Sequence, residues 1–380
     1  MINKESISLY VHLPWCIKKC PYCDFNSHEL KNDLPEDEYI DCLLEDFNSH
    51  LYVIRNREIS SVFFGGGTPS LFSAKSLDRL LTTLQSKIKF SLNCEITLEA
   101  NPGTVEQTRF KNYFEIGINR ISLGIQSFQA EKLKALGRIH NDVEAHRAID
   151  AVKNAGFTNF NIDIMHGLPN QSLEDALYDL NQAIQHQPTH LSWYQLTIEP
   201  NTYFYKNTPL LPNEDILEEI EKNGFSLLEK NHYNRYEISA YALDGKQSQH
   251  NKNYWLFGDY LGIGAGAHSK LTMDEKVTRH WNHKSPYSYM KKGEAFISNK
   301  IEIKENDIIF EFMLNALRLF QPVSFELFEN RTGLNRDVLK IPFALAVQKG
   351  LLKDKPFIET TDIGKKYLND LCRIFIRPNV

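Results

Sequence analysis

The amino-acid sequence predicts an α/β protein with a parallel sheet in its first 200 residues and a small helical domain at its C-terminal end. Six short β-rich runs occur between residues 7 and 196, amphipathic helical patterns separate them, and the alternation stops near Pro200. Strands that alternate with helices form parallel sheets with right-handed crossovers. The pattern fits an open doubly wound sheet, a full barrel or a partial barrel.

Each predicted strand is a short run of apolar and β-branched residues. The runs cover residues 7–13, 61–64, 94–98, 121–125, 157–164 and 190–196. Between them, apolar residues recur with the helical period of 3.6. One such stripe follows the acidic first turn at residues 36–38, and others begin after Ser73, near Ala145 and after Ser172. These four segments predict helices between consecutive strands.

Beyond residue 200 the rhythm changes. The sequence predicts a long helix over residues 213–231, a short strand around residues 236–241 and a Gly-rich stretch at residues 258–266. Helical apolar patterns fill residues 301–380, where a short hairpin between residues 350 and 365 would give a winged-helix-like shape. We therefore expect a barrel-like part at residues 1–205, a linking or extension region at residues 206–300 and a helical domain at residues 301–380.

Composition excludes several classes of function. The chain has 43 basic and 48 acidic side chains, for a net charge of −5, so it offers no general attraction for nucleic acid. No apolar run is long enough to cross a membrane, although a peripheral membrane contact stays compatible with the sequence. Six cysteines are too few for a disulfide-stapled secreted protein, and we see no signal peptide. These features predict a cytoplasmic protein.

Three of the cysteines form a compact group. Cys16, Cys20 and Cys23 follow the first predicted strand in a loop that contains two prolines. Three thiolates on one short loop suit zinc or an iron–sulfur cluster, since soft sulfur ligands select these metals. Zinc would need His12 or His28 as a fourth ligand, whereas a 4Fe–4S cluster would keep one iron open to another molecule. Three buried packing cysteines are the remaining interpretation.

Polar and glycine residues gather where the other predicted strands end. Gly65-Gly66-Gly67-Thr68-Pro69 follows the second strand, Glu99 ends the third, Gln126 ends the fourth, and Asp163 lies on the fifth. The carboxyl ends of parallel strands meet on one face, where barrel enzymes place their sites. The Gly-rich turn lets backbone groups approach a ligand closely, and no lysine follows it to complete a phosphate-binding loop.

The spacing Cys16-x3-Cys20-x2-Cys23 resembles the signature of the radical S-adenosylmethionine (SAM) superfamily. That resemblance implies a 4Fe–4S cluster on the three cysteines, SAM on the open iron, and an electron donor for the cluster. The motifs YVHLPWC, GGGTP, EANP, GIQS and DIMHGLP resemble, in order and spacing, the oxygen-independent coproporphyrinogen III oxidase family over nearly the whole chain. The resemblance implies a partial (β/α)6 barrel that resembles a TIM barrel. It also implies SAM contacts from Tyr10, Tyr22, Gly66, Gly67, Thr68, Glu99, Gln126, Arg138 and Asp163.

Two features separate this chain from the true oxidases. Phe25 stands where those enzymes carry a further cysteine, and His250-Asn-Lys-Asn-Tyr254-Trp255 forms an HNxxYW segment. Both features resemble the HemW-type haem chaperones, which implies a protein that binds haem as cargo and hands it to acceptor proteins. An oxidase proper and a zinc-stabilised adaptor are the alternatives.

The HNxxYW segment is the predicted haem contact. His250 would offer an axial imidazole, and Tyr254 and Trp255 would offer flat apolar faces. A histidine beside aromatic residues is also commonly a hydrogen-bonded structural residue. His12, His166 and His268 are weaker candidates for the haem contact.

Overall fold

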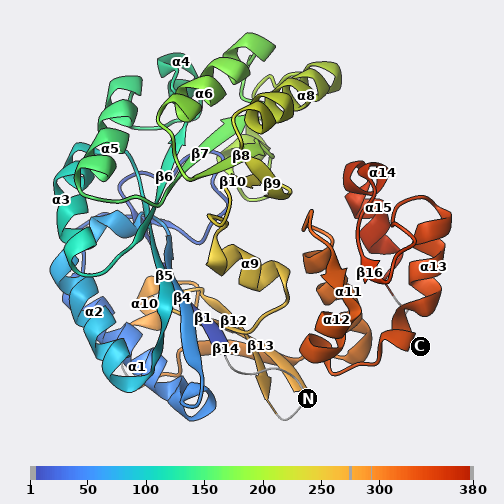
Figure 1. Cartoon of the computed structure of the whole chain (residues 1–380). Coiled ribbons are helices and arrows are strands. Elements are labelled where there is room, and N and C mark those ends of the chain that lie inside the picture. Colours follow the sequence, from blue (N-terminus) through green and yellow to red (C-terminus); the bar gives the residue numbers. More distant parts are fainter. Residues whose placement is uncertain (1–5, 274–275, 292, 377–380) are drawn as a thin grey trace.

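A single large sheet organises the first 300 residues of the protein (Figure 1). The structure is a computed structural model that describes residues 6–273, 276–291 and 293–376, with the backbone alone at residues 104–108. Within these residues the sheet has 12 strands in the order β14-β13-β12-β11-β1-β4-β5-β6-β7-β8-β10-β9. The two ends of this order do not pair with each other, so the sheet is open rather than a closed barrel.

The six strands predicted from the sequence form the centre of the sheet. They run in chain order and every neighbouring pair is parallel, which confirms the predicted class. Their carboxyl ends therefore lie on one edge, and the side chains that follow them converge there. The strands are β1 (Ser6–Leu13), β4 (Glu58–Gly66), β5 (Phe90–Ala100), β6 (Arg120–Gln126), β7 (Phe160–His166) and β8 (His190–Gln195).

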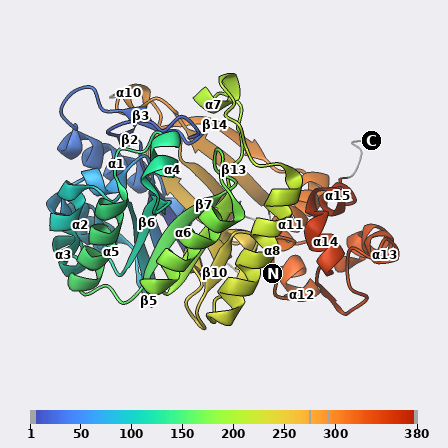
Figure 2. The same ribbon diagram turned by 90° about the horizontal axis from the view of Figure 1, so that it is seen from above.

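Helices connect these strands and cover the outer side of the sheet (Figures 1 and 2). Their apolar stripes bury leucine and isoleucine side chains in one core with the strands. Ser73 and Ser172 cap two of them, and Ser172 forms a reciprocal capping box with Asp175. The helices are α1 (Glu36–Ile54), α2 (Ala74–Lys87), α3 (Thr104–Glu115), α4 (Ala130–Ala135), α5 (Asp142–Asn154), α6 (Leu173–Gln185) and α8 (Glu214–Lys230).

The sheet extends beyond the predicted strands at both edges. β11 (Tyr260–Ile263) lies parallel to β1, and β12 (His268–Met273), β13 (Lys276–Asn282) and β14 (Ile297–Glu302) continue antiparallel from it. At the other edge, the single strand expected near residue 236 is a tight pair, β9 (Asn234–Glu237) and β10 (Ala240–Ala242). β11 escaped prediction because its four residues lie inside the Gly-rich stretch.

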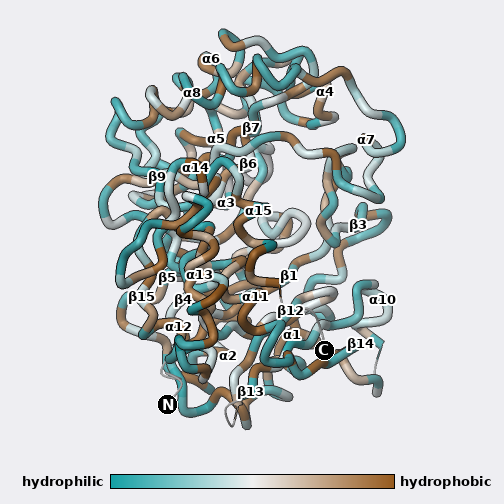
Figure 3. Tube along the Cα trace, turned by 90° about the vertical axis from the view of Figure 1, so that its right-hand side faces the viewer, coloured by the Kyte–Doolittle hydropathy of each residue, from teal (hydrophilic) through white to brown (hydrophobic). Residues whose placement is uncertain are grey.

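The C-terminal part is helical, as predicted, and has a core of its own. Phe312, Phe328 and Ile309 are completely buried in that core. Figure 3 shows hydrophobic residues along α11 (Glu305–Ala316) and α13 (Lys340–Gln348). β15 (Val323–Ser324) pairs with β16 (Phe357–Ile358), and Leu352 bridges Thr360. The helices are α11 (Glu305–Ala316), α12 (Phe325–Thr332), α13 (Lys340–Gln348), α14 (Asp362–Lys366) and α15 (Leu368–Arg373).

Residues 206–300 belong to the large sheet through β9 to β14, and α9 (Gln249–Trp255) lies between β10 and β11 in the chain. The domain boundaries at residues 205 and 300 stay a prediction. Among the described residues, every helix is too short or too polar to span a lipid bilayer.

Candidate functional site

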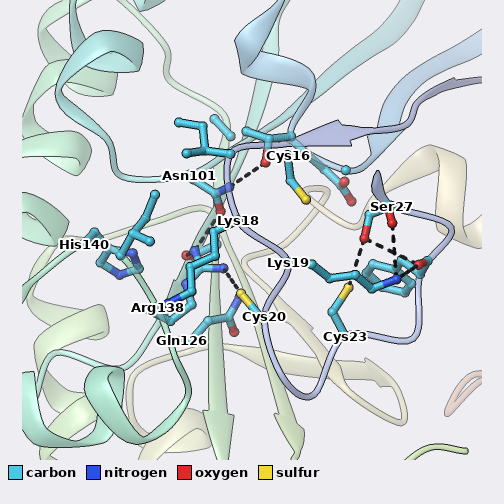
Figure 4. A pocket seen from close by; sticks show the side chains of 18 of the residues that line it. Cys16, Lys18, Lys19, Cys20, Cys23, Ser27, Asn101, Gln126, Arg138 and His140 are labelled. Atoms are coloured by element: carbon cyan, nitrogen blue, oxygen red, sulfur yellow. Dashed lines mark hydrogen bonds between the residues drawn. The ribbon is translucent and has the colours of Figure 1, made fainter. Parts of the chain in front are cut away.

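A cavity of about 460 Å³ opens at the carboxyl ends of β4, β5, β6 and β7. We call it the first cavity; Figure 4 shows it from close by. The loop after β1, which carries the three clustered cysteines, forms one wall. The structure brings together here all but one of the residues predicted for the cluster and SAM. These lining residues are Cys16, Cys20, Tyr22, Cys23, Gly66, Gly67, Thr68, Glu99, Gln126, Arg138 and Asp163.

The cysteine loop is held at both ends. It runs between two short paired strands, β2 (Trp15–Cys16) and β3 (His28–Glu29). The Cys16 thiol lies 3.7 Å from the His28 carbonyl oxygen, and the Cys23 thiol lies 3.7 Å from the Ser27 hydroxyl. All three cysteines are outside disulfides. Burial raises the pKa of the Cys16 thiol to about 11.

The three thiols do not form a site for a single metal ion. Among the described residues, no three His, Cys, Asp or Glu side chains are placed to hold one ion. A zinc ion would need its sulfur ligands at about 2.3 Å from one centre. In a 4Fe–4S cluster each cysteine binds a different iron, so the sulfur atoms lie further apart. The placement of the described side chains therefore does not support the zinc interpretation.

A hydrogen-bonded row connects the Gly-rich turn to the cysteine loop. Asn101 donates to the Thr68 hydroxyl at 2.9 Å and accepts from Arg138 at 2.7 Å. Arg138 also donates to the Gly124 carbonyl oxygen at 2.6 Å and to the Cys20 sulfur at 3.7 Å. Its buried Nε has no partner among the described residues. The guanidinium is thus fixed in direction and keeps donor capacity for an anionic ligand group.

Two carboxyl groups face the same cavity. Burial, and next the proximity of Asp163, raise the pKa of Glu99 to about 8, although the Gly66 N–H donates to Glu99 at 3.3 Å. Burial also raises the pKa of Asp163, against hydrogen bonds from Ser122 and Asn161. Neither carboxyl forms an ion pair within the described part of the chain. A cationic ligand would stabilise the ionised forms of both carboxyl groups.

Gln126 shows backbone strain at the carboxyl end of β6. Its φ of 71° lies in the left-handed region, next to a register shift between Gly124 and Gln126. The Tyr194 hydroxyl donates to the Gln126 side chain at 2.8 Å and fixes it in the cavity. Strain of this kind concentrates at ligand sites. Asn101, Ser122 and Tyr194 were not among the predicted site residues, although Asn101 lies within the EANP motif.

A second cavity of about 770 Å³ adjoins the first. Six residues line both cavities: Lys19, Cys23, Phe25, Ser27, Gly66 and Glu99. Tyr10, which we expected beside SAM, lines the second cavity and not the first. Its hydroxyl lies 2.9 Å from His12 Nδ1. Tyr254 and His268 also line the second cavity.

The structure separates the members of the HNxxYW segment. His250 is 1% exposed, with Nδ1 at 3.0 Å from the Ser61 hydroxyl and Nε2 at 3.1 Å from the Tyr254 hydroxyl. Trp255 instead packs on Arg318, whose guanidinium carbon lies 4.3 Å from the ring centroid. Both ring nitrogens of His250 therefore have hydrogen-bond partners in this conformation. The haem contact of the segment stays a prediction.

The structure also shows the surroundings of His12, His166 and His268, the weaker candidates for the haem contact. Both ring nitrogens of His12 have partners, since Nε2 lies 2.9 Å from the Asn26 carbonyl oxygen. His166 is buried against Trp193, with ring centroids 4.4 Å apart. Of the three, only His268 is exposed.

Comparison with known proteins agrees with this geometry. The Radical SAM superfamily matches residues 10–183, and the HemN C-terminal domain family matches residues 303–355. The solved structure of coproporphyrinogen III oxidase (HemN) from Escherichia coli, described as a radical SAM enzyme, superposes with a TM-score of 0.83. It covers 98% of this chain and 90% of its own, at 22% identity, which supports the fold.

Curated relatives cover the chain from end to end. The heme chaperone HemW of Haemophilus influenzae is 50% identical over 376 residues, which is 97% of this chain and 98% of its own. The heme chaperone HemW of Escherichia coli is 46% identical over 99% of this chain and all of its own, and that of Lactococcus lactis is 34% identical over the full length of both. The chain therefore belongs to the radical SAM superfamily and, within it, to the family of the heme chaperones HemW.

Proposed function

We propose that this protein binds haem as cargo and passes it to acceptor proteins, on a scaffold that holds a 4Fe–4S cluster and SAM. The observation that carries the proposal is the 50% identity, over nearly the whole chain, with a heme chaperone. The same comparisons do not favour the alternative, an oxygen-independent coproporphyrinogen III oxidase, because the likeness to that enzyme is 22% identity in a shared fold.

The first cavity supplies the groups that a cluster with SAM would need. Cys16, Cys20 and Cys23 would ligate three irons, and the open iron would take the amino and carboxylate groups of SAM. Arg138 would pair with the SAM carboxylate through its free donors, and the unpaired acids Glu99 and Asp163 would face its cationic and hydroxyl groups. When bound and reduced, the cluster would supply an electron for cleavage of SAM.

The backbone around the cavity fits a ligand that approaches closely. Gly66 has a φ of 119°, and a side chain there would meet the His12 ring at 2.7 Å. Thr68, Gln126 and Tyr22 would complete the SAM contacts, with Gln126 held by Tyr194. We propose that Tyr10 acts from the neighbouring second cavity.

The cargo site would adjoin the cluster. Phe25 stands in place of the oxidase cysteine, is 62% exposed and lines both cavities. It offers an apolar surface for a porphyrin and no thiol for chemistry on it. Tyr254 would add a second aromatic face and His250 would hold it from outside the cavity, whereas Trp255 packs on Arg318. An electron donor and haem acceptors complete the proposed partners, and the free thiols suit the reducing cytoplasm.

Haem titration of the anaerobically purified protein tests the function. We expect a saturable change in the haem Soret absorbance, and transfer of the bound haem to apomyoglobin as a probe acceptor. Absence of any haem-dependent change would refute the chaperone proposal. Formation of protoporphyrinogen from coproporphyrinogen, with dithionite and SAM, would show that the protein is an oxidase.

A further inference from the structure

We propose that the second cavity is the haem site and that His268 ligates the haem iron. This inference rests on the haem-binding function proposed above and gives it a place and a ligand. The cavity volume of about 770 Å³ lies within the roughly 300–1,000 Å³ of small-molecule and cofactor sites. Residues from β1, from the cysteine loop and from β11 and β12 surround it.

Of the histidines that line this cavity, only His268 offers an accessible ring nitrogen. Both nitrogens of His12 have hydrogen-bond partners. His28 has a fully enclosed Nε2, and its ring faces the Lys284 backbone. His268 is exposed, and no described residue hydrogen-bonds to its ring. A neutral imidazole with a free nitrogen is a common iron ligand.

The fold fixes the direction of the His268 ring. His268 is the first residue of β12 and pairs with Trp281 of β13, and the two rings stack with centroids 5.8 Å apart at 19°. The backbone of β11 also packs tightly against His268, since a Cβ at Gly262 would lie 2.1 Å from the His268 carbonyl oxygen. Partial burial, together with the positive charges of Arg279 and Lys284, lowers the pKa of His268 and favours the neutral form that binds a metal.

The rest of the cavity matches the chemistry of haem, a flat apolar ring with two carboxylates. Tyr10, Tyr254, Tyr260 and Phe25 supply aromatic surface. Lys284 lines the same cavity, is exposed and has no ion pair among the described residues, so it is free to pair with a propionate.

This assignment also gives the HNxxYW segment a physical role. His250 lies beneath the second cavity rather than in it, and its Nε2 meets the Tyr254 hydroxyl at 3.1 Å. His250 stacks on Phe63 at 4.9 Å, and Phe63 stacks on Tyr10 at 6.3 Å. His250 is thus a positioning residue for the aromatic wall, and Tyr254 is the member of the segment that touches the cargo.

The test compares three alanine variants by haem titration and by spectra of the bound haem, all in anaerobically purified protein. We expect His268→Ala to raise the Kd for haem about tenfold or more and to shift the Soret band and the electron paramagnetic resonance spectrum of the ferric haem. His283→Ala is the matched control, because His283 lines neither cavity, and it should match the wild type. His250→Ala should weaken binding while the spectrum of the bound haem stays that of a His268 complex.

Circular dichroism and a His268→Gln variant guard against misfolding, since glutamine keeps the size of the side chain without the imidazole. A wild-type spectrum and Kd in both His268 variants would overturn the inference. So would loss of iron ligation in His250→Ala alone, which would assign the ligand to His250. Failure of the wild-type protein to bind haem is a separate outcome, which would refute the proposed function itself.

Discussion

Gly67 lies in the Gly-rich turn and packs directly against the backbone of Trp15, where the cysteine loop begins. Replacing Gly67 with alanine should therefore displace the loop. A Cβ at Gly67 would lie 2.4 Å from the Trp15 carbonyl oxygen, where ordinary contacts are 3.4 Å or longer. The two backbones would have to separate by about 1 Å, the difference between these distances. The Trp15 carbonyl also accepts the Thr68 N–H at 2.7 Å, so the shift would break this bond. Trp15 directly precedes Cys16, which would move with it.

Overpacking against rigid backbone costs about 1–3 kcal/mol, and one lost hydrogen bond costs about 0.5–1.5 kcal/mol. We therefore expect Gly67→Ala to lower the free energy of unfolding by about 2–4 kcal/mol. Because the strain falls beside Cys16, the variant should also lose most of its iron after anaerobic reconstitution. Denaturant titration of the apo-protein and iron analysis of the reconstituted protein measure the two effects.

Gly117→Ala is the control for a general loss of stability. Gly117 has a φ of 93° with no atom within 4 Å of a built Cβ, so alanine there strains the backbone without a clash. It should cost about 1–2 kcal/mol and leave the iron content unchanged. Wild-type iron content and stability in Gly67→Ala would refute the contact argument.

Three further predictions concern the first cavity. Because the pKa of Glu99 is about 8, its carboxyl is mostly protonated at pH 7, so binding of cationic SAM should tighten as pH rises from 7 to 9, by at most tenfold per unit. Calorimetry should show that Glu99→Gln removes this dependence, and an unchanged profile would contradict it. Arg138→Lys should weaken SAM binding by about tenfold, because lysine cannot keep the bonds to Asn101 and Cys20 together; equal affinity would argue against the role. Cys20→Ser should abolish the visible absorbance of the cluster while Cys94→Ser, in a buried packing position, keeps it; iron loss in the latter would show that the ligands are misassigned.

Local signals explain how much of the fold the sequence predicted. The six central strands carry continuous apolar runs because both faces of a parallel sheet are buried, and the helices between them carry 3.6-residue stripes. The strands β11 to β14 lack such a signal. β11 has four residues in a Gly-rich stretch, and β13 mixes charged and apolar residues, so only their pairing in space reveals them as strands.

The sequence by itself determined the α/β class, the cysteine loop and the strand-end residues Glu99, Gln126 and Asp163, because spacing along the chain and the positions of strand ends carry that information. Tyr22 and Arg138 came from the resemblance to known families, and Asn101, Ser122 and Tyr194 were not predicted. Tertiary structure alone decided which side chains are free to act. It paired both ring nitrogens of His250, moved Tyr10 to the second cavity and left His268 exposed there. The physical reason is that a partner such as Ser61, which meets His250 Nδ1, comes from β4, 189 residues away in the chain, so a motif shows which residues are present but not what they already bind.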